Sequence, residues 1–226
     1  MITAIIPARG GSKGIPRKNV ISLCGKPLIA WSIEQAQQSQ LVNRVVVATD
    51  DDEIASVARY HGADVYWRSA ASASDIAPTE QVIAEWLRTA EPAPATCVLL
   101  QATSPIRQPY DVDECLATMI AQDADSCFSA RIVHGYTWRR GLGILSANYS
   151  QRLPRQQHSL TTLEENGSIY CFKTDVFRET GNRLGGKVAA YLMHPLDSFQ
   201  VDEMSDLQVL AELMEVRLNV RPAAAS

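Results

Sequence analysis

Short apolar runs alternate with longer amphipathic segments along the first 121 residues. The runs ITAIIP, RVVVATD and TCVLLQ are brief and rich in β-branched residues, a pattern typical of buried strands. Pro27 near the start of one longer segment and Gly62 at the end of another mark helix boundaries. We therefore expect strands at 2–7, 44–50, 63–68 and 96–101, and helices at 25–39, 51–62, 79–90 and 109–121.

This alternation predicts an α/β fold. Strands that each lead into a helix pair in parallel, and helices then cover both faces of the sheet. We expect three layers with a mostly parallel sheet. After about residue 125 the expected strands are 125–133, 166–174 and 188–193, with an irregular stretch at 134–160 and a closing helix at 205–219. Ser205 and Gln208 fit a capping box at the start of that helix.

Polar clusters follow three of the predicted strands. PARGGSKG comes after the first, TDDDE after the second, and QATSP after the strand at 96–101. Ligands of parallel α/β sheets bind beyond the carboxyl ends of the strands, so these clusters predict a binding site. The acids of TDDDE either form a wall beside a ligand or, as we prefer, include the N-cap of the next helix at Asp50 or Asp51.

Composition narrows the class of protein. The chain has 226 residues, is 46% hydrophobic and carries a formal charge of −4, which is enough for one sizeable core and argues against nucleic-acid binding. Neither a signal peptide nor a run of about 20 apolar residues is evident, so we expect no membrane partner. Five scattered cysteines without metal-ligand spacing indicate reduced thiols in a cytoplasmic protein.

The segment after the first strand, residues 8–19, is called the basic loop here. Within ARGGSKGIPRKN stand four cations, Arg9, Lys13, Arg17 and Lys18, together with three glycines and a serine. The loop matches neither GxxxxGK[ST] nor GxGxxG. Glycine nevertheless lets backbone N–H groups approach an anion, and the cations supply charge, so a polyphosphate is the expected ligand. A solvated basic turn is the alternative.

The blocks PARGGSKGIPRKN, GKPLIAWSIEQA and VVVATDDDEIASVARYHGADVYWR resemble, in order, blocks of the acylneuraminate cytidylyltransferases, the CMP-sialic acid synthetases. LLQATSP, PRQQ, ENGSIY, RLGGK and DSFQVDEMSDL continue the resemblance along most of the chain. The related 3-deoxy-manno-octulosonate enzymes have a loop without GGSKG. The resemblance implies a Rossmann-like nucleotidyltransferase, 1–226 as one domain, with a small dimerisation and sugar-side insertion near 134–195 and hence a homodimer.

The resemblance also implies an activity and a set of nucleotide contacts. Members of the family join CTP to a nine-carbon 2-keto sugar acid and release pyrophosphate. The residues that match nucleotide-binding positions are Arg9, Gly10, Gly11, Ser12, Lys13, Lys18, Asn19, Arg68, Thr79 and Gln101. Arg9 and Lys13 are expected to grip the leaving phosphates, Lys18 to lie nearer the other end of the nucleotide, and Arg17 to be solvated.

On the sugar side the matching residues are Gln101, Arg155, Asn166 and Tyr170. Arg155 would pair with the sugar carboxylate, and strand alternation places Tyr170 on one face with Ser168. Asp202 matches the metal position and is expected to hold Mg²⁺ as a catalytic residue beside Lys13 and Arg9. Many family members carry D-x-D here, whereas this chain has Gln200 in place of the first acid.

Three alternatives stay open from the sequence. The sugar is sialic acid or a legionaminic- or pseudaminic-type acid, and GTP in place of CTP is a variant of the same chemistry. A non-catalytic nucleotide- or sugar-binding homologue is favoured only by the missing acid at Gln200. Retention of the matches for triphosphate, carboxylate and metal argues for an enzyme.

Overall fold

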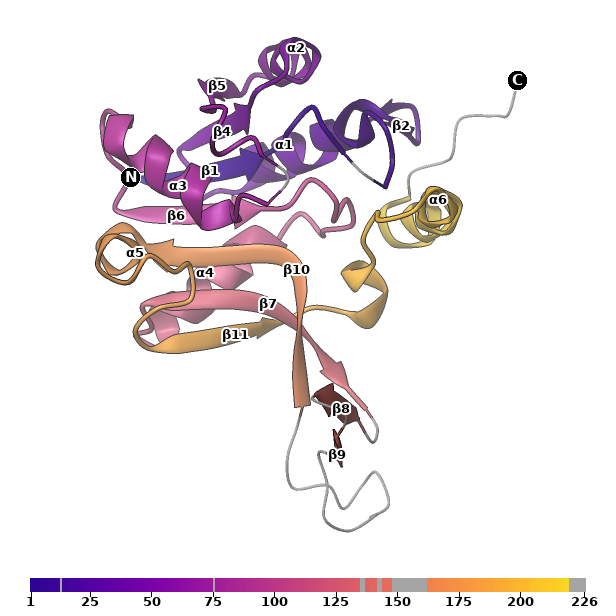
Figure 1. The fold of residues 1–226 in the computed structure, drawn as a ribbon. Helices are drawn as coiled ribbons and strands as arrows, with labels where there is room; N and C mark the ends of the chain where they lie inside the picture. The colour runs from indigo at the N-terminus through magenta and orange to yellow at the C-terminus, as the bar shows by residue number, and fades with distance from the viewer. Residues whose placement is uncertain (13, 75, 135–136, 142–143, 148–161, 220–226) are drawn as a thin grey trace.

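The structure, a computed structural model, describes residues 1–12, 14–74, 76–134, 137–141, 144–147 and 162–219. In this part of the chain a seven-stranded sheet has the order β11-β7-β10-β6-β1-β4-β5 (Figure 1). Its strands are β1 (Ile2–Pro7), β4 (Arg44–Thr49), β5 (Asp64–Trp67), β6 (Thr96–Leu100), β7 (Ser126–Val133), β10 (Thr162–Lys173) and β11 (Val188–Leu192). The helices are α1 (Leu28–Gln38), α2 (Asp52–Tyr60), α3 (Thr79–Thr89), α4 (Asp111–Ala121), α5 (Thr174–Thr180) and α6 (Met204–Leu218).

The sheet is mostly parallel, as the alternation of strands and helices predicts. β1 pairs in parallel with β4 and β6, β4 with β5, and β7 with β11. The exception is β10, which runs antiparallel to both β6 and β7. Antiparallel neighbours need no crossover helix. The described segments between β7 and β10 accordingly form a small hairpin, β8 (Trp138–Gly141) with β9 (Ile144–Ala147), within the stretch expected to be irregular.

Two hydrophobic cores lie on opposite faces of the sheet, which confirms the three-layer arrangement. One core joins the strands to α1, α2 and α4 through residues such as Ile33, Ile54 and Leu116. The other joins them to α3 and α5 through Trp86 and Phe177. A third cluster packs α6 against α1 and the end of the basic loop, with Trp31 and Met214 among its members.

The closing helix begins one residue earlier than expected and has a different cap. Glu203 is the N-cap, and its side chain and that of Asp206 form the capping box. The carboxylate of Asp206 accepts hydrogen bonds from the backbone N–H groups of Asp202 and Glu203, at 2.8 and 2.7 Å. The predicted capping box of Ser205 and Gln208 is therefore wrong, because the side chains of Glu203 and Asp206 form both halves of the motif two residues earlier.

Parallel pairing brings the carboxyl ends of β1, β4 and β6 to one edge of the sheet. Pro7 at the end of β1 is the register partner of Ala48 in β4, and Ile5 is the partner of Leu99 in β6. The basic loop, the TDDDE run and the QATSP segment therefore all leave the sheet at this edge. Among the described residues, no helix has the length and apolar character to cross a bilayer.

Candidate functional site

A cavity of about 320 Å³ opens at this edge. It is lined by the basic loop, by the segment after β5, by the start of α3 and by the end of β6. The structure thereby brings together most of the predicted nucleotide-binding residues, namely Arg9, Gly11, Ser12, Lys18, Asn19, Arg68, Thr79 and Gln101. Lys13 and Arg155 lie outside the described residues. The nucleotide contacts themselves stay predictions.

The cavity is built for an anion. Arg9, Lys18 and Arg68 are the charged side chains among its described lining residues, and no carboxylate stands among that set. Burial lowers the pKa of Arg68, whose guanidinium hydrogen-bonds the backbone carbonyl of Ser72. Nη1 of Arg9 donates to the carbonyl of Ser74 at 3.1 Å. Three cations facing one concave surface create a positive potential that attracts phosphate or carboxylate groups.

Two glycines let the basic loop pass between neighbouring segments. A Cβ on Gly10 would lie 2.6 Å from Oδ2 of Asp51, and one on Gly14 would lie 2.7 Å from the carbonyl oxygen of Asp202. Both distances are too short for any larger residue. The amide of Asn19 donates to the carbonyl of Arg9 at 2.9 Å and so ties the two ends of the loop together.

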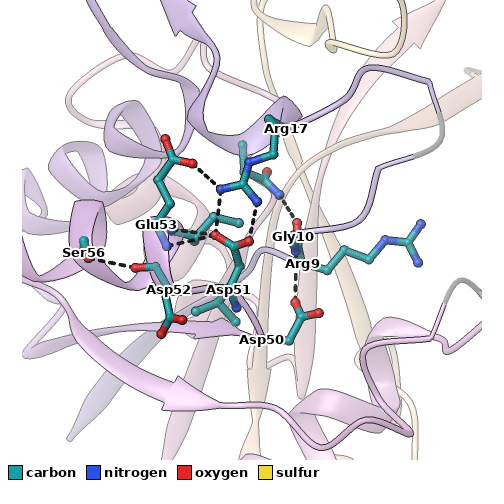
Figure 2. Close-up of polar contacts among 11 residues, drawn as sticks. Arg9, Gly10, Arg17, Asp50, Asp51, Asp52, Glu53 and Ser56 are labelled. Carbon is teal, nitrogen blue, oxygen red and sulfur yellow. Dashed lines mark hydrogen bonds and ion pairs between the residues drawn. The ribbon is translucent and has the colours of Figure 1, made fainter.

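Arg17 is exposed, with 44% of its side chain accessible, as expected, but it also has protein partners that the sequence did not reveal. Its guanidinium donates to both carboxylate oxygens of Asp51 and to Glu53, as Figure 2 shows. The hydrogen bond from Arg17 lowers the pKa of Asp51. The sequence could not reveal these contacts, because they join positions 34 and 36 residues apart.

The acids after β4 behave mainly as a helix start. Asp51 is the N-cap of α2 and accepts from the N–H groups of Glu53 and Ile54, each at 3.0 Å, which confirms the preferred interpretation of TDDDE. Asp50 instead accepts a hydrogen bond from the N–H of Gly10 at 3.0 Å (Figure 2). A predicted phosphate-binding N–H therefore already contacts a carboxylate in this structure.

Asp202 lies beside the loop, outside the cavity lining. Nζ of Lys18 is 3.4 Å from its Oδ1 and donates to the carbonyl of Val201 at 2.7 Å. The Asp202 side chain is 74% exposed, so it has room for a cation with water and phosphate ligands. The described residues contain no cluster of three His, Cys, Asp or Glu side chains suited to a metal. Gln200 donates to the carbonyl of Asn166, so it supports the backbone there.

Asn166 and Tyr170 do not line the described cavity. The Asn166 side chain is buried and accepts from the hydroxyl of Ser129 at 2.6 Å while its amide contacts Ser198 at 3.2 Å. Tyr170 is 3% exposed, packs in the core beneath α3 and α5, and donates from its hydroxyl to Glu165 at 3.0 Å. Both side chains are engaged inside the protein, and their sugar contacts stay predictions.

Sequence reasoning missed Arg107, which is buried behind the cavity. Its guanidinium donates to the carbonyls of Gln101 at 2.8 Å and Ser168 at 2.9 Å. It also donates to Ser32 and Gln35 of α1, each at 2.9 Å. Burial lowers its pKa to about 9. Arg107 thus joins the end of β6 to β10 and α1, and an arginine in the polar segment SPIRQP gives no sign of that position.

The fold and the cavity define a class: an α/β protein with a cavity lined by cations at the end of the first strand of its sheet. Within that class, the chain belongs to the cytidylyltransferase family, whose sequence profile matches residues 3–179. It is 38% identical over 208 residues to N-acylneuraminate cytidylyltransferase A of Danio rerio, covering 89% of this chain and 48% of the relative. The chain therefore spans about half the length of the first curated relatives it matches.

Two further similarities cover nearly the whole of both chains. CMP-N,N'-diacetyllegionaminic acid synthase of Legionella pneumophila is 30% identical over 224 residues, covering 95% of this chain and 97% of the relative. A solved structure of CMP:2-keto-3-deoxy-manno-octonic acid synthetase complexed with CTP has a TM-score of 0.71 at 20% identity, covering 95% of this chain and 98% of that one. The latter likeness shows the fold alone, and it confirms the predicted Rossmann-like α/β architecture.

Proposed function

We propose that the protein transfers the cytidylyl group of CTP to the 2-hydroxyl of a nine-carbon 2-keto sugar acid, giving the CMP-sugar and pyrophosphate. The observation that carries the proposal is the cationic cavity at the carboxyl ends of β1 and β6 in a chain of the cytidylyltransferase family. A triphosphate carries more negative charge than any other part of either substrate, and a cavity lined by cations, Arg9 among them, suits that charge.

In the proposed reaction the sugar hydroxyl attacks the α-phosphorus of CTP in line and gives its proton to water, while the bond between the α-phosphorus and the oxygen that bridges to the β-phosphorus breaks. Arg9, Ser12 and Lys13 hold the departing pyrophosphate, while the backbone of Gly11 faces it. Gln101 stands at the border between nucleotide and sugar. Catalysis on this chain's side is positioning and neutralisation of charge. Mg²⁺ held by the exposed carboxylate of Asp202, by water and by the phosphates would supply Lewis acidity to the phosphoryl oxygens and the attacking hydroxyl.

The sugar side rests on fewer described contacts. Arg155 would form a bidentate pair with the sugar carboxylate. Asn166 and Tyr170, being engaged inside the protein, would shape that part of the site or rearrange to meet the sugar. A legionaminic-type acid is the second candidate, because the relative of that name matches along nearly its whole length, whereas the neuraminate relative is matched over about half of its length.

The proposal includes an assembly and a location. Residues 1–226 would form one nucleotidyltransferase domain that acts as a homodimer in the cytoplasm. β7 and β10 extend past the helical layers toward β8 and β9 (Figure 1), which gives the region 134–195 an arm suited to contact a second copy. All five cysteines are free, which suits a reducing compartment.

The test is a matrix of CTP, GTP, UTP and ATP against a panel of nonulosonic acids, with Mg²⁺, in which pyrophosphate is measured and the sugar product is weighed by mass spectrometry. We expect product with CTP and one class of sugar. Lys13→Ala should lower turnover by about 100-fold or more while the protein stays folded. If calorimetry shows that CTP binds but no combination of nucleotide and sugar releases pyrophosphate, the protein is instead a non-catalytic binding protein.

A further inference from the structure

Arg17 is a basic-loop cation that stands outside the cavity lining. Its guanidinium forms a bidentate ion pair with Asp51 and a further ion pair with Glu53 (Figure 2). Two parallel N–H···O bonds between an arginine and a carboxylate fix orientation as well as distance. The side chain of Asp51 is 17% exposed and that of Arg17 is 44% exposed, so only the carboxylate of this pair is largely shielded from water and salt. Arg17 is therefore held by carboxylates of the protein and is not among the described residues that line the cavity.

The backbone of Arg17 determines how the cavity residues after it are presented. Its φ of 58° and ψ of 27° lie in the left-handed region, which residues with a Cβ rarely adopt. Arg17 precedes the short helix η1 (Lys18–Val20), and its carbonyl accepts from the N–H of Val20 at 3.0 Å. The direction of the side chains of Lys18 and Asn19, which line the cavity, thus depends on a strained residue whose guanidinium is held in place.

One carboxylate contacts both ends of the basic loop. Asp51 pairs with Arg17 near the end of the loop, and it packs against Gly10 near the start, where a Cβ would be 2.6 Å away. The same side chain caps α2 through Glu53 and Ile54, so it is fixed to a regular element. The loop is thereby ion-paired to the N-cap residue of α2 near its end and lies close against the same residue near its start.

We propose that Arg17 is a positioning residue for triphosphate binding: through Asp51 and Glu53 it holds the basic loop on α2 before the nucleotide arrives. The inference rests on the proposed function. A loop that is already ordered loses less conformational freedom on binding, so the pairing strengthens nucleotide affinity without touching the nucleotide. Removing the guanidinium should leave the chemistry of the bound state intact and make reaching that state less favourable.

The first test needs no substrate. Amide hydrogen exchange is measured on full-length wild type and Arg17→Met, without ligand, in peptides covering residues 8–20. We expect exchange in this segment to accelerate about tenfold or more in the variant, while β1 and β4 keep their protection. Arg178→Met is the matched control, because Arg178 pairs with the exposed side chain of Asp175 within α5. Unchanged exchange in the loop would overturn the proposal.

The second test separates binding from turnover. Arg17→Met should raise the KM for CTP about tenfold with less than about a threefold change in kcat. Arg17→Lys keeps the positive charge but not the bidentate guanidinium, so its KM should lie between those of wild type and Arg17→Met. The double exchange of Arg17→Glu with Glu53→Arg should recover part of the KM that Arg17→Glu alone loses. A fall in kcat at unchanged KM would place Arg17 in the chemical step and overturn the positioning role.

The two tests fail in different ways. If wild type releases no pyrophosphate with any nucleotide, the proposed function fails, yet the exchange measurement still decides whether Arg17 orders the loop. If wild type is active and Arg17→Met has the same KM and the same loop exchange as Arg178→Met, only the positioning role fails. Should Arg17→Met unfold, Arg17→Lys carries both measurements.

Discussion

The ammonium group of Lys18 lies 3.4 Å from Oδ1 of Asp202, so the residue matched to nucleotide binding and the residue matched to metal binding are paired with each other. Their side chains differ in exposure: that of Lys18 is 14% exposed and that of Asp202 is 74% exposed. Lys18 also donates to the carbonyl of Val201, which fixes it beside the cavity. A cation that arrives at Asp202 would therefore share that carboxylate with Lys18.

This arrangement predicts a magnesium phenotype for Asp202→Asn. The amide keeps the shape of the side chain but loses its charge, so the attraction for a hard cation falls. We expect the Mg²⁺ concentration for half-maximal pyrophosphate release to rise about tenfold or more, with lower maximal turnover. The measurement is initial rate against Mg²⁺ at saturating CTP and sugar.

Asp206→Asn is the matched control for that titration. Asp206 is close to Asp202 in the sequence, but its carboxylate already accepts hydrogen bonds from the backbone N–H groups of Asp202 and Glu203. These bonds belong to the capping box of α6. We expect it to lower the free energy of unfolding by about 0.5–1 kcal/mol while leaving the Mg²⁺ requirement close to that of wild type. Equal Mg²⁺ curves for wild type and Asp202→Asn would show that the metal binds elsewhere.

Asp50 offers a second prediction, on nucleotide affinity. Its carboxylate accepts the N–H of Gly10 and faces the charge of Arg68, so it occupies a position that suits an anion. A triphosphate that uses the same N–H must displace it. Asp50→Asn should therefore lower the Kd of CTP, by about threefold to tenfold, since neutralising the carboxylate removes a competing negative charge.

The control for Asp50→Asn is Asp52→Asn, which makes the same change of charge two residues along, in the exposed first turn of α2. Calorimetry with CTP should show little change for Asp52→Asn. Weaker CTP binding by Asp50→Asn than by Asp52→Asn would mean that Asp50 supports the loop instead of competing with the ligand.

The third prediction concerns Arg107. Arg107→Met removes hydrogen-bond donors from four oxygens. Two of these oxygens keep another hydrogen bond: the carbonyl of Gln101 accepts from the hydroxyl of Ser32 at 3.3 Å, and the carbonyl of Ser168 accepts from the N–H of Gln101 at 3.4 Å. The variant also relieves the cost of burying a charge. We expect the lost hydrogen bonds to dominate and the free energy of unfolding to fall by about 1–3 kcal/mol in urea titrations. Exposed Arg88→Met should change it by less than about 0.5 kcal/mol, and an equal effect of the two would contradict the expectation.

Local pattern was sufficient to predict most of the fold. The apolar runs at β1, β4 and β6 and the helix boundaries near Gly62 and Thr79 are set by neighbouring residues, so they can be read from the sequence. The antiparallel direction of β10 could not, because it depends on how the chain returns through β8 and β9.

The candidate site likewise combines features that follow from local sequence with features that depend on distant segments. Cations after the first strand predicted the cavity, since strand ends and loop composition are local. The surroundings of Arg17, Arg107 and Tyr170 could not be read from the sequence because they come from distant segments: Asp51, Ser168 and the core beneath α3 respectively. Whether an arginine faces a ligand, an acid or a carbonyl is decided by tertiary contacts that composition does not encode.

The last prediction concerns acid stability and the pair of Arg17 with Asp51. The hydrogen bond from Arg17 lowers the pKa of Asp51 in the folded state, with smaller contributions from the N–H groups of Ile54 and Glu53. A carboxyl whose folded pKa lies below its unfolded value of about 3.9 stabilises the fold above that pH, and this stabilisation is lost as the pH falls. Arg17→Met should therefore lose less stability than wild type between pH 6 and pH 3, values chosen to bracket about 3.9.

The measurement is the difference in free energy of unfolding between wild type and Arg17→Met, from urea titrations at several pH values. Contacts that do not involve Arg17 also lower the pKa of Asp125 and Asp206, so these groups titrate alike in both proteins and cancel in the difference. We expect the difference to be constant above about pH 5 and to shrink as Asp51 is protonated below about pH 4. A difference independent of pH over that range would contradict the ion pair between Arg17 and Asp51.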